Sequence, residues 1–433
     1  MRRRNPSIAL GFLALILLGA GLLNAPFARN AHEFGRFSDA LFTACSAVCV
    51  TGLTIVDIAA EYTRIGQWIL LVLVELGCLG LMTLGTFFII AIGRRLSLTR
   101  EFSLMNAYGV EQVQGLRGLI IWVVGLMVIV EGLGAVILNY HLHDWYLSFF
   151  YSVMSYCNAG FSILPGSLAI FADDPLVLMT LGAETILGGI GFLVIYNLCT
   201  FWNRRGRLSL HSSVMLRFTG YLLIAGFALF LLLEWDNTLK DFDWVKKVYL
   251  AFYHAITPRT CGFSVLPIEK LAPFTRLIYE AMMFLGGGPG SAAAGLKLTT
   301  FAVLIYTILA MCRGDRETII SKRVVAYDTV REAFVIFVAL VALIIFTLGA
   351  LLLTEHGEPN FSGERLLFEA ISAITTTGLS CGDTTSSLSA GGRVVIMVAM
   401  FCGRLGALAV VMLIGEREVA RHVRFPSGEL VVG

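Results

Sequence analysis

Four short runs centred on a glycine constrain the fold of this chain more than any other feature of its sequence. They read CVTGLT at residues 49–54, CNAGFS at 157–162, RTCGFS at 259–264 and TTTGLS at 375–380. In each run the glycine is followed by Leu or Phe and then by a hydroxyl residue. Glycine adopts backbone conformations that other residues avoid, and irregular backbone at membrane depth is tolerated only where protein buries it or it lines a water-filled path. The four runs therefore predict one pore with four walls.

The composition places these runs in a polytopic membrane protein. Of the 433 residues, 57% are hydrophobic and only 14% are charged, against about 25% charged residues in soluble domains. The 44 glycines suit close helix packing in lipid. The nine cysteines contain no CxxC pair, so the sequence indicates neither a disulfide framework nor a zinc site.

The helical segments fall into four sets, each with a span, a short segment, a glycine run and a second, long span. The spans are predicted at residues 8–23 and 66–92, 119–138 and 176–201, 214–233 and 274–311, and 334–353 and 394–414. The short segments are predicted at residues 37–48, 145–156, 244–256 and 365–374. Because a helical span needs about 20 apolar residues, the short segments are interpreted as re-entrant pore helices. The expected fold is all-α, with eight spans and four pore helices around one pseudo-fourfold axis.

Glycine spacing supports an internal repeat. Gly52, Gly160, Gly262 and Gly378 are 108, 102 and 116 residues apart, and each long span carries a Gly-x-x-Gly that begins 25, 28, 25 and 25 residues after its run glycine. Four nearly constant offsets are typical of a repeated unit. We expect repeats at residues 1–92, 93–203, 204–313 and 314–433, the last with a cytoplasmic carboxyl-terminal tail.

Basic residues predict the orientation. The amino end, the loops that join the sets and the tail hold 19 Lys and Arg, whereas the loops with the glycine runs hold 11. By the positive-inside rule both termini are cytoplasmic, in a multi-pass protein of the plasma (bacterial inner) membrane. An alternative for residues 1–23 is a secretory signal, because three arginines precede an apolar run. The repeat requires the same run as its first helix.

The runs have the chemistry of an ion filter. Backbone carbonyls can replace the hydration shell of a cation without burying a formal charge, and pore helices direct their carboxyl-end dipoles at it. An ordinary turn is the alternative for any single run. The expected filter residues are Val50, Thr51 and Gly52; Asn158, Ala159 and Gly160; Thr260, Cys261 and Gly262; and Thr376, Thr377 and Gly378.

These residues resemble the Trk/Ktr/HKT superfamily of potassium transporters over essentially the whole chain, most closely the Ktr membrane subunit. The resemblance implies a channel-like potassium uptake subunit with one glycine in each filter strand, K+ as the transported ion and Na+ as a candidate activator. It also implies a membrane homodimer that docks a cytosolic nucleotide-binding regulatory ring. The chain departs from the family at Cys261, where the family often has Ala, a change that should leave the backbone path intact.

The third long span is interrupted by GGGPGSAAAGLK at residues 286–297. Pro and repeated Gly cannot sustain a helix, so backbone unwound here must line a cavity. The resemblance implies that this intramembrane loop is a gate, with Gly287, Gly288, Pro289, Gly290, Ser291 and Lys297 as its site residues. A kink that serves packing is the alternative. Lys297 is expected to reach the cytoplasm or to pair with an acidic residue.

Charged residues within the spans are candidate functional groups, because they are costly to insert. Arg404 lies in the fourth Gly-x-x-Gly, and the resemblance implies an arginine at the constriction that opposes cation passage. Bonding to loose carbonyls of the interrupted span is the alternative, and both roles are compatible. The carboxylates of Glu75, Glu131, Glu184 and Glu280 are candidate proton or sodium sites, or structural partners of Arg and hydroxyl groups.

Two other classes of function were weighed. An alternating-access transporter, coupled to sodium or protons, would have broken helices in two inverted halves, whereas every run here lies on one side. An enzyme would need a convergent nucleophile, histidine or metal cluster, and the seven histidines lack such spacing. No Walker motif is present, and neither nucleotide nor nucleic acid binding by this chain is expected.

Overall fold

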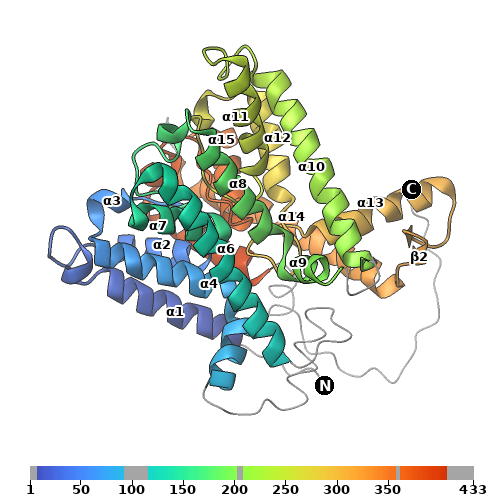
Figure 1. Cartoon of the computed structure of the whole chain (residues 1–433), viewed down its shortest axis with the longest axis horizontal. Helices are drawn as coiled ribbons and strands as arrows, with labels where there is room; N and C mark the ends of the chain where they lie inside the picture. Colours follow the sequence, from blue (N-terminus) through green and yellow to red (C-terminus); the bar gives the residue numbers. More distant parts are fainter. Residues whose placement is uncertain (1–6, 92–115, 202–207, 357–360, 407–433) are drawn as a thin grey trace.

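The computed structural model describes residues 7–91, 116–201, 208–356 and 361–406, and these are almost entirely helical (Figure 1). The first two segments of the chain contain α1 (Ser7–Leu23), η1 (Pro26–Ala28), α2 (Phe37–Val48), α3 (Ile58–Glu61) and α4 (Arg64–Ala91), then α6 (Leu116–Leu142), α7 (Trp145–Tyr156), η2 (Ala169–Phe171), α8 (Pro175–Ile190) and α9 (Phe192–Cys199). The third contains α10 (Leu210–Glu234), α11 (Trp244–Ile256), η3 (Ile268–Lys270), α12 (Pro273–Phe284) and α13 (Leu298–Arg313). The fourth contains α14 (Tyr327–Thr354), α15 (Gly363–Ile374), α16 (Thr384–Ser387) and α17 (Ala390–Leu405). The boundary between the third and fourth segments is thus set between α13 and α14, inside the described range 208–356.

One short hairpin departs from the expected all-helical fold. Strands β1 (Ile319–Ile320) and β2 (Arg323–Val324) pair antiparallel between α13 and α14. Ser321 and Lys322 form the two-residue connection with positive φ, at 51° and 64°, which is the backbone that two-residue hairpins require. The hairpin lies at the edge of the molecule and contacts α13 (Figure 1).

The four short helices form where the sequence predicts them. Helices α2, α7 and α11 have the predicted bounds, and α15 begins two residues earlier, at Gly363. Each is largely buried, and α7 and α15 are capped by side chains, Asp144 for α7 and Ser362 for α15. A capping carboxylate or hydroxyl satisfies amide groups that the first turn leaves unbonded. The bilayer is too thick for helices of this length to cross.

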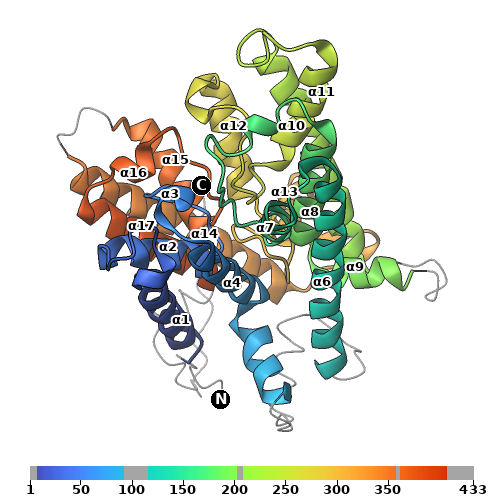
Figure 2. The ribbon, with the colours of Figure 1, turned by 60° about the vertical axis from the view of Figure 1, so that its left-hand side comes forward.

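Packing between segments closes a ring. Within each segment the short helix packs on its neighbours in sequence, as α2 does on α1 and α4. Across segments, α7 packs on α4, α11 on α8, α15 on α12, and α2 on α17. In Figure 2 the blue start and the red end of the described chain accordingly lie side by side. The contact of α2 with α17 completes a cycle of four.

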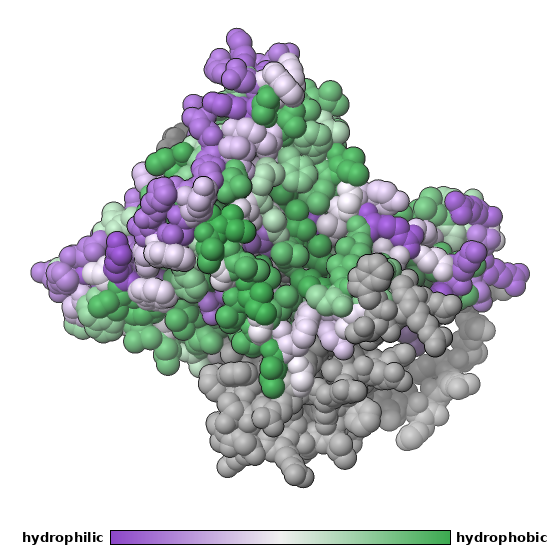
Figure 3. Space-filling model, in the orientation of Figure 1, coloured by the Kyte–Doolittle hydropathy of each residue, from purple (hydrophilic) through white to green (hydrophobic). Residues whose placement is uncertain are grey.

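The outer surface suits a lipid environment. Within the described residues, three helices are long and apolar enough to cross a membrane, at Ile121–Leu142, Leu210–Glu234 and Tyr327–Thr354, and the bent pair α8 and α9 makes a fourth. Large apolar side chains stand exposed on these helices, including Val128, Leu232 and Phe346. Figure 3 shows hydrophobic side chains over the middle of one face, with hydrophilic ones gathered towards its corners. Such a surface is the expected boundary with acyl chains.

The second, long span of a segment is interrupted in more segments than the sequence predicts. The break in the third is confirmed, because α12 ends at Phe284 and α13 begins at Leu298. The span predicted at residues 176–201 is broken as well, since α8 and α9 meet at Gly191 with a bend of 98°. The first is also kinked at Gly80. Gly80 and Gly191 have φ of 67° and 97°, a left-handed conformation that ends regular helix.

The first glycine of the Gly-x-x-Gly has a packing role in three segments. A Cβ atom on Gly77, Gly188 or Gly403 would collide with the carbonyl oxygen of the last residue of α2, α7 or α15. The long helix therefore lies directly against the carboxyl end of its short helix, which only glycine allows. The third segment differs, because a Cβ on Gly287 would instead meet the carbonyl oxygen of Gly189.

This packing predicts an effect of substitution on stability. Gly188→Ala places a methyl group against the Tyr156 carbonyl, and we expect it to lower the free energy of unfolding by about 2 kcal/mol. The measurement is thermal unfolding of the purified protein in detergent. Gly132→Ala in α6 is the matched control, because its Cβ meets nothing within 4 Å and alanine favours helix by about 1 kcal/mol. Equal melting temperatures for the two variants would contradict the close contact.

Candidate functional site

The strand after each short helix has the same unusual backbone. The residue two positions before each glycine has a left-handed φ: 54° at Val50, 56° at Asn158, 65° at Thr260 and 49° at Thr376. The glycines follow with φ of 92°, 65°, 78° and 85°. Asn tolerates this region, but β-branched Val and Thr rarely adopt it. Strain of this kind, which costs about 1–3 kcal/mol per residue, is concentrated at functional sites.

Hydrogen bonds to the short helices hold this backbone. The amide of the residue before the glycine turns back to a helix carbonyl: Thr51 N–H donates to Ser46 O at 2.8 Å, Ala159 N–H to Met154 O at 2.9 Å, and Thr377 N–H to Ser372 O at 2.8 Å. In the third strand Cys261 N–H donates to Thr257 O at 3.1 Å. The amide groups are thereby used within the segment, and the carbonyl groups beyond them are left for other partners.

The carbonyl oxygens of these residues meet the glycines of neighbouring strands. Ala159 O lies against Gly52, Cys261 O against Gly160, Thr377 O against Gly262, and Thr51 O against Gly378. A Cβ atom on Gly160 would stand 2.7 Å from the Cα of Gly262, and one on Gly262 would stand 2.6 Å from Thr377 O. The structure thus brings the four glycines and four carbonyls into one closed ring.

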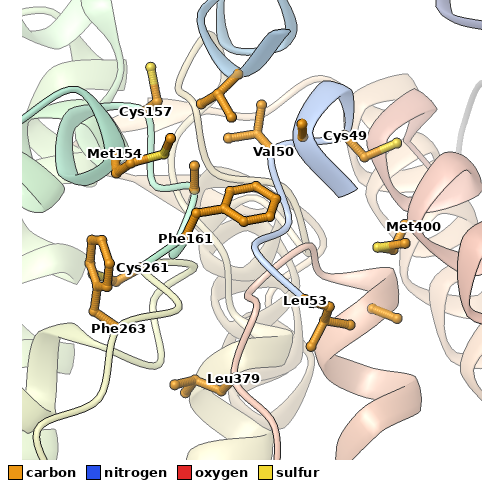
Figure 4. Close-up of a cluster of buried hydrophobic side chains, with 14 of the residues drawn as sticks. Cys49, Val50, Leu53, Met154, Cys157, Phe161, Cys261, Phe263, Leu379 and Met400 are labelled. Carbon is orange, nitrogen blue, oxygen red and sulfur yellow. The ribbon is translucent and has the colours of Figure 1, made fainter. Parts of the chain in front are cut away.

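The large apolar residue after each glycine fixes its strand from outside the ring. Leu53, Phe161, Phe263 and Leu379 are each at most 2% exposed. Figure 4 shows them among other buried side chains, each coming from a differently coloured part of the ribbon. Their burial leaves the backbone, not the side chains, to form the ring. The hydrophobic residue that recurs in the four sequence runs has this packing role.

A second layer lies next to the ring. A Cβ on Gly77 would approach the Val50 side chain to 2.9 Å, and one on Gly189 would approach Asn158 Nδ2 to 3.4 Å. Residues 286–297 form an irregular loop in this layer and bond to the break between α8 and α9. Gly288 N–H donates to Gly189 O at 2.9 Å, Ala292 N–H to Gly188 O at 3.1 Å, and Phe192 N–H to Gly290 O at 3.3 Å. The second and third segments are therefore joined here by backbone bonds.

Arg404 joins the remaining two segments to this loop. Its guanidinium donates to Ala292 O at 2.7 Å and also to Gly77 O. The arginine from α17 thus bridges the third and first segments. Bonding to loose carbonyls, one of its two predicted roles, is present in the geometry.

Other predicted gate residues bond within the loop. Lys297 Nζ donates to Ala293 O at 2.6 Å. Its partner is therefore a backbone carbonyl and not an acidic residue, which was one of the two predictions for it. Ser291 Oγ donates to Gly288 O at 2.6 Å. Pro289 and Gly290 lie against the break in the second segment, because a Cβ on Gly191 would stand 2.8 Å from Pro289 O. The side chains of the loop therefore stabilise its folded-back shape.

Two of the four predicted carboxylate residues are neighbours. Glu131 and Glu184 are buried on α6 and α8, and Ser152 Oγ contacts both residues, at the backbone oxygen of Glu131 and the carboxylate of Glu184. Glu75 lies on α4. Glu280 lies elsewhere, beside a groove of about 480 Å³ between α12, α14 and α15. Within the described residues no group of three or more His, Cys, Asp or Glu is arranged to hold a metal ion.

The breaks at Gly80 and Gly191 are the feature of this layer that the sequence analysis missed. Their signal was present as the second glycine of the repeated Gly-x-x-Gly. In all four segments that glycine, at position 80, 191, 290 or 406, has a positive φ between 67° and 97°. No Pro accompanies these glycines outside the third segment, so their spacing predicts a repeat but not a helix break.

Comparison with known families and proteins identifies relatives along the whole chain. The family model described as TrkH, cation transport protein, matches residues 22–422. The Ktr system potassium uptake protein B of Bacillus subtilis is 33% identical, over 98% of this chain and 96% of that protein. The potassium/sodium uptake protein NtpJ of Enterococcus hirae is also 33% identical, with the same coverage.

A solved structure shares the fold. The crystal structure of the potassium transporter TrkH from Vibrio parahaemolyticus superposes with a TM-score of 0.74 and covers 96% of this chain and 86% of that chain, at 15% identity. At this identity the likeness concerns the fold alone. The relatives are membrane cation transport proteins and not enzymes.

Proposed function

Because the chain belongs to the TrkH family of cation transport proteins, we propose that it is the channel-like subunit of a potassium uptake system in the plasma membrane. Its filter is the ring of Thr51, Ala159, Cys261 and Thr377 carbonyls with the four glycines. The ring carries the proposal, since four backbone carbonyls, one from each strand, lie in one closed ring of contacts, and backbone carbonyls are the ligands that replace the hydration shell of a monovalent cation. K+ is the substrate, as the names of the relatives indicate for those proteins.

Orphaned polar atoms support this function. The hydroxyl oxygens of Thr51, Thr260 and Thr376 are buried and make no hydrogen bond within the described part of the chain. A buried hydroxyl without a partner costs roughly 1–3 kcal/mol. Oxygens that line an ion path have a reason to stay unpaired, because a hydrated or partly hydrated cation supplies their contacts.

The second layer is the proposed gate. The loop at residues 286–297 and Arg404 lie beside the ring, and the guanidinium charge would oppose a cation that approaches it. Since Arg404 is held by Ala292 O and Gly77 O, opening requires these bonds to break. Movement of the loop would then displace the guanidinium charge and the loop backbone together.

The architecture behind this proposal is four membrane-pore-membrane repeats with the boundaries given above. The termini are cytoplasmic, and the basic inner loops face a cytosolic nucleotide-binding ring, with the chain in a homodimer and Na+ as an activator. The cyclic packing of α2, α7, α11 and α15 on the preceding segments supports four walls around one axis.

A coupled, alternating-access transporter is the second candidate. The breaks at Gly80 and Gly191 favour it, because broken helices are typical of such transporters. Flux measurements in liposomes distinguish the two functions. Strict stoichiometric exchange with Na+ or H+ would support the second candidate, and potassium tracer uptake down its own gradient supports the first.

The first functional prediction concerns growth. Expression of the chain, with a cytosolic partner where needed, should restore growth at limiting potassium to bacteria that lack their own uptake systems. Gly52→Ser and Gly262→Ser should abolish the rescue, since each adds a Cβ against a neighbouring strand at a φ of 92° or 78°. Failure of the wild-type chain in every background would contradict potassium uptake.

The second functional prediction concerns Arg404. Arg404→Ala removes both the charge and the two carbonyl bonds, so we expect a several-fold rise in unstimulated potassium uptake by proteoliposomes. Arg404→Lys keeps the charge but cannot reproduce the planar fork that reaches two carbonyls. If charge is the barrier, uptake by the lysine variant should remain close to that of the wild type.

Arg393→Ala is the matched control for this prediction. Arg393 lies on the same helix, α17, but it bonds to Asp39, Leu388 O and Ser386 O, away from the loop. Its uptake should match that of the wild type. Unchanged uptake by Arg404→Ala at normal expression would count against the barrier role.

A further inference from the structure

Three of the short helices fasten the segment that follows their filter strand through a buried polar side chain. On α7, Tyr151 OH shares a hydrogen bond of 2.7 Å with Ser162 Oγ. On α11, His254 Nε2 accepts from Leu266 N–H at 3.2 Å. On α15, the Glu369 carboxylate is bonded to the segment after Gly378. Tyr151, His254 and Glu369 are all fully buried.

The positions of two of these bonds, on α7 and α15, correspond between segments. Tyr151 and Glu369 each precede their filter glycine by nine residues, and Ser162 and Ser380 each follow it by two. The hydroxyl that recurs at the end of the sequence runs thus has a bonding role in the second and fourth segments. In the first segment the corresponding Thr43 donates to Asp39 O within its own helix, at 2.9 Å.

Glu369 makes the most extensive of these attachments. Its Oε1 accepts from Ser380 Oγ at 2.5 Å and from Cys381 N–H at 3.1 Å, and its Oε2 accepts from Thr385 Oγ1 at 2.7 Å. All three donors are neutral groups. The fourth strand is therefore fastened more strongly at its outer end than the second, which has the single tyrosine bond.

These bonds reach the ring through only a few atoms. Ser380 is two residues after Gly378, and between them Leu379 is 2% exposed. At the other end of the strand, Thr377 N–H is held by Ser372 O on the same helix. The strand is thus fixed to α15 at both ends, and a change at Ser380 shifts Gly378 and the Thr377 carbonyl that contacts Gly262.

We propose that Glu369 is a positioning residue for cation selection, which holds the fourth filter strand at the spacing that the ring requires. The proposal rests on the function proposed above. Glu369 acts through Ser380 and the backbone and does not itself contact the ion. Among Tyr151, His254 and Glu369, Glu369 makes the most hydrogen bonds to the residues after its glycine. The four strands of the ring are therefore not equally stiff.

Glu369→Gln tests the proposal because it keeps the size of the side chain. The amide retains one acceptor oxygen, so it cannot accept from Ser380, Cys381 and Thr385 on two oxygens. We expect the KM for K+ to rise about tenfold, as loss of one buried hydrogen bond predicts, and the preference for K+ over Na+ to fall. The measurement is uptake of K+, Rb+ and Na+ by proteoliposomes, with melting temperature and amount of folded protein recorded for each variant.

Matched variants separate selection from folding. Glu364→Gln is the control, since Glu364 lies on the same helix, is half exposed and pairs with Arg276 at 2.8 Å. It should leave KM and ion preference unchanged. Ser380→Ala should shift both in the same direction as Glu369→Gln, and the double variant should be no worse than the stronger single one, because the two residues share a bond. Tyr151→Phe should have a smaller effect.

Two results would overturn the proposal. One is wild-type KM and ion preference in Glu369→Gln, and the other is a fall in maximal rate alone, in proportion to lost folded protein. Gly378→Ala distinguishes this failure from failure of the filter itself. If that variant loses ion preference and Glu369→Gln keeps it, the positioning role is wrong and the filter stands; if both keep it, the ring is not the filter.

Discussion

The structure depends on the close contact between a carbonyl oxygen and a glycine that has no Cβ. The contact recurs around the ring, where the carbonyl before one glycine lies against the glycine of the preceding strand, in all four strands. Any side chain at these glycines would separate the strands, so the ring exists only because four residues lack one. The left-handed backbone two residues earlier is the local strain that aligns these contacts.

The same contact positions the ring within the helices. Gly77, Gly188 and Gly403 bring a long helix against the carboxyl end of a short one, where partial negative charge favours a nearby cation. Three residues later a second glycine ends or bends that helix. In the first, second and fourth segments the helix break therefore lies next to the ring, because one Gly-x-x-Gly both packs against the short helix and ends or bends the long helix. Arg404 occupies the first position between two such glycines and joins three segments with two hydrogen bonds.

The segments differ in ways that a fourfold description conceals. The third segment has a proline and a long loop, whereas the first and second segments each have a single glycine at which the helix bends. The residues that follow the ring glycines are attached to the short helices by a tyrosine, a histidine or a carboxylate. One fused chain can specialise each wall in this way, which identical subunits cannot.

The sequence by itself determined the short helices, the four glycine runs and the break at residues 286–297, because helix length, hydrophobicity and glycine or proline content are local properties. It did not predict the breaks at Gly80 and Gly191, the carbonyl partners of Arg404 or the attachment of Ser380 to Glu369. Only the tertiary structure decided these, along with which carbonyl meets which glycine. The physical reason is that such contacts join residues far apart in sequence, so their geometry follows from how α4, α8, α12 and α17 pack against the next segment and close the ring.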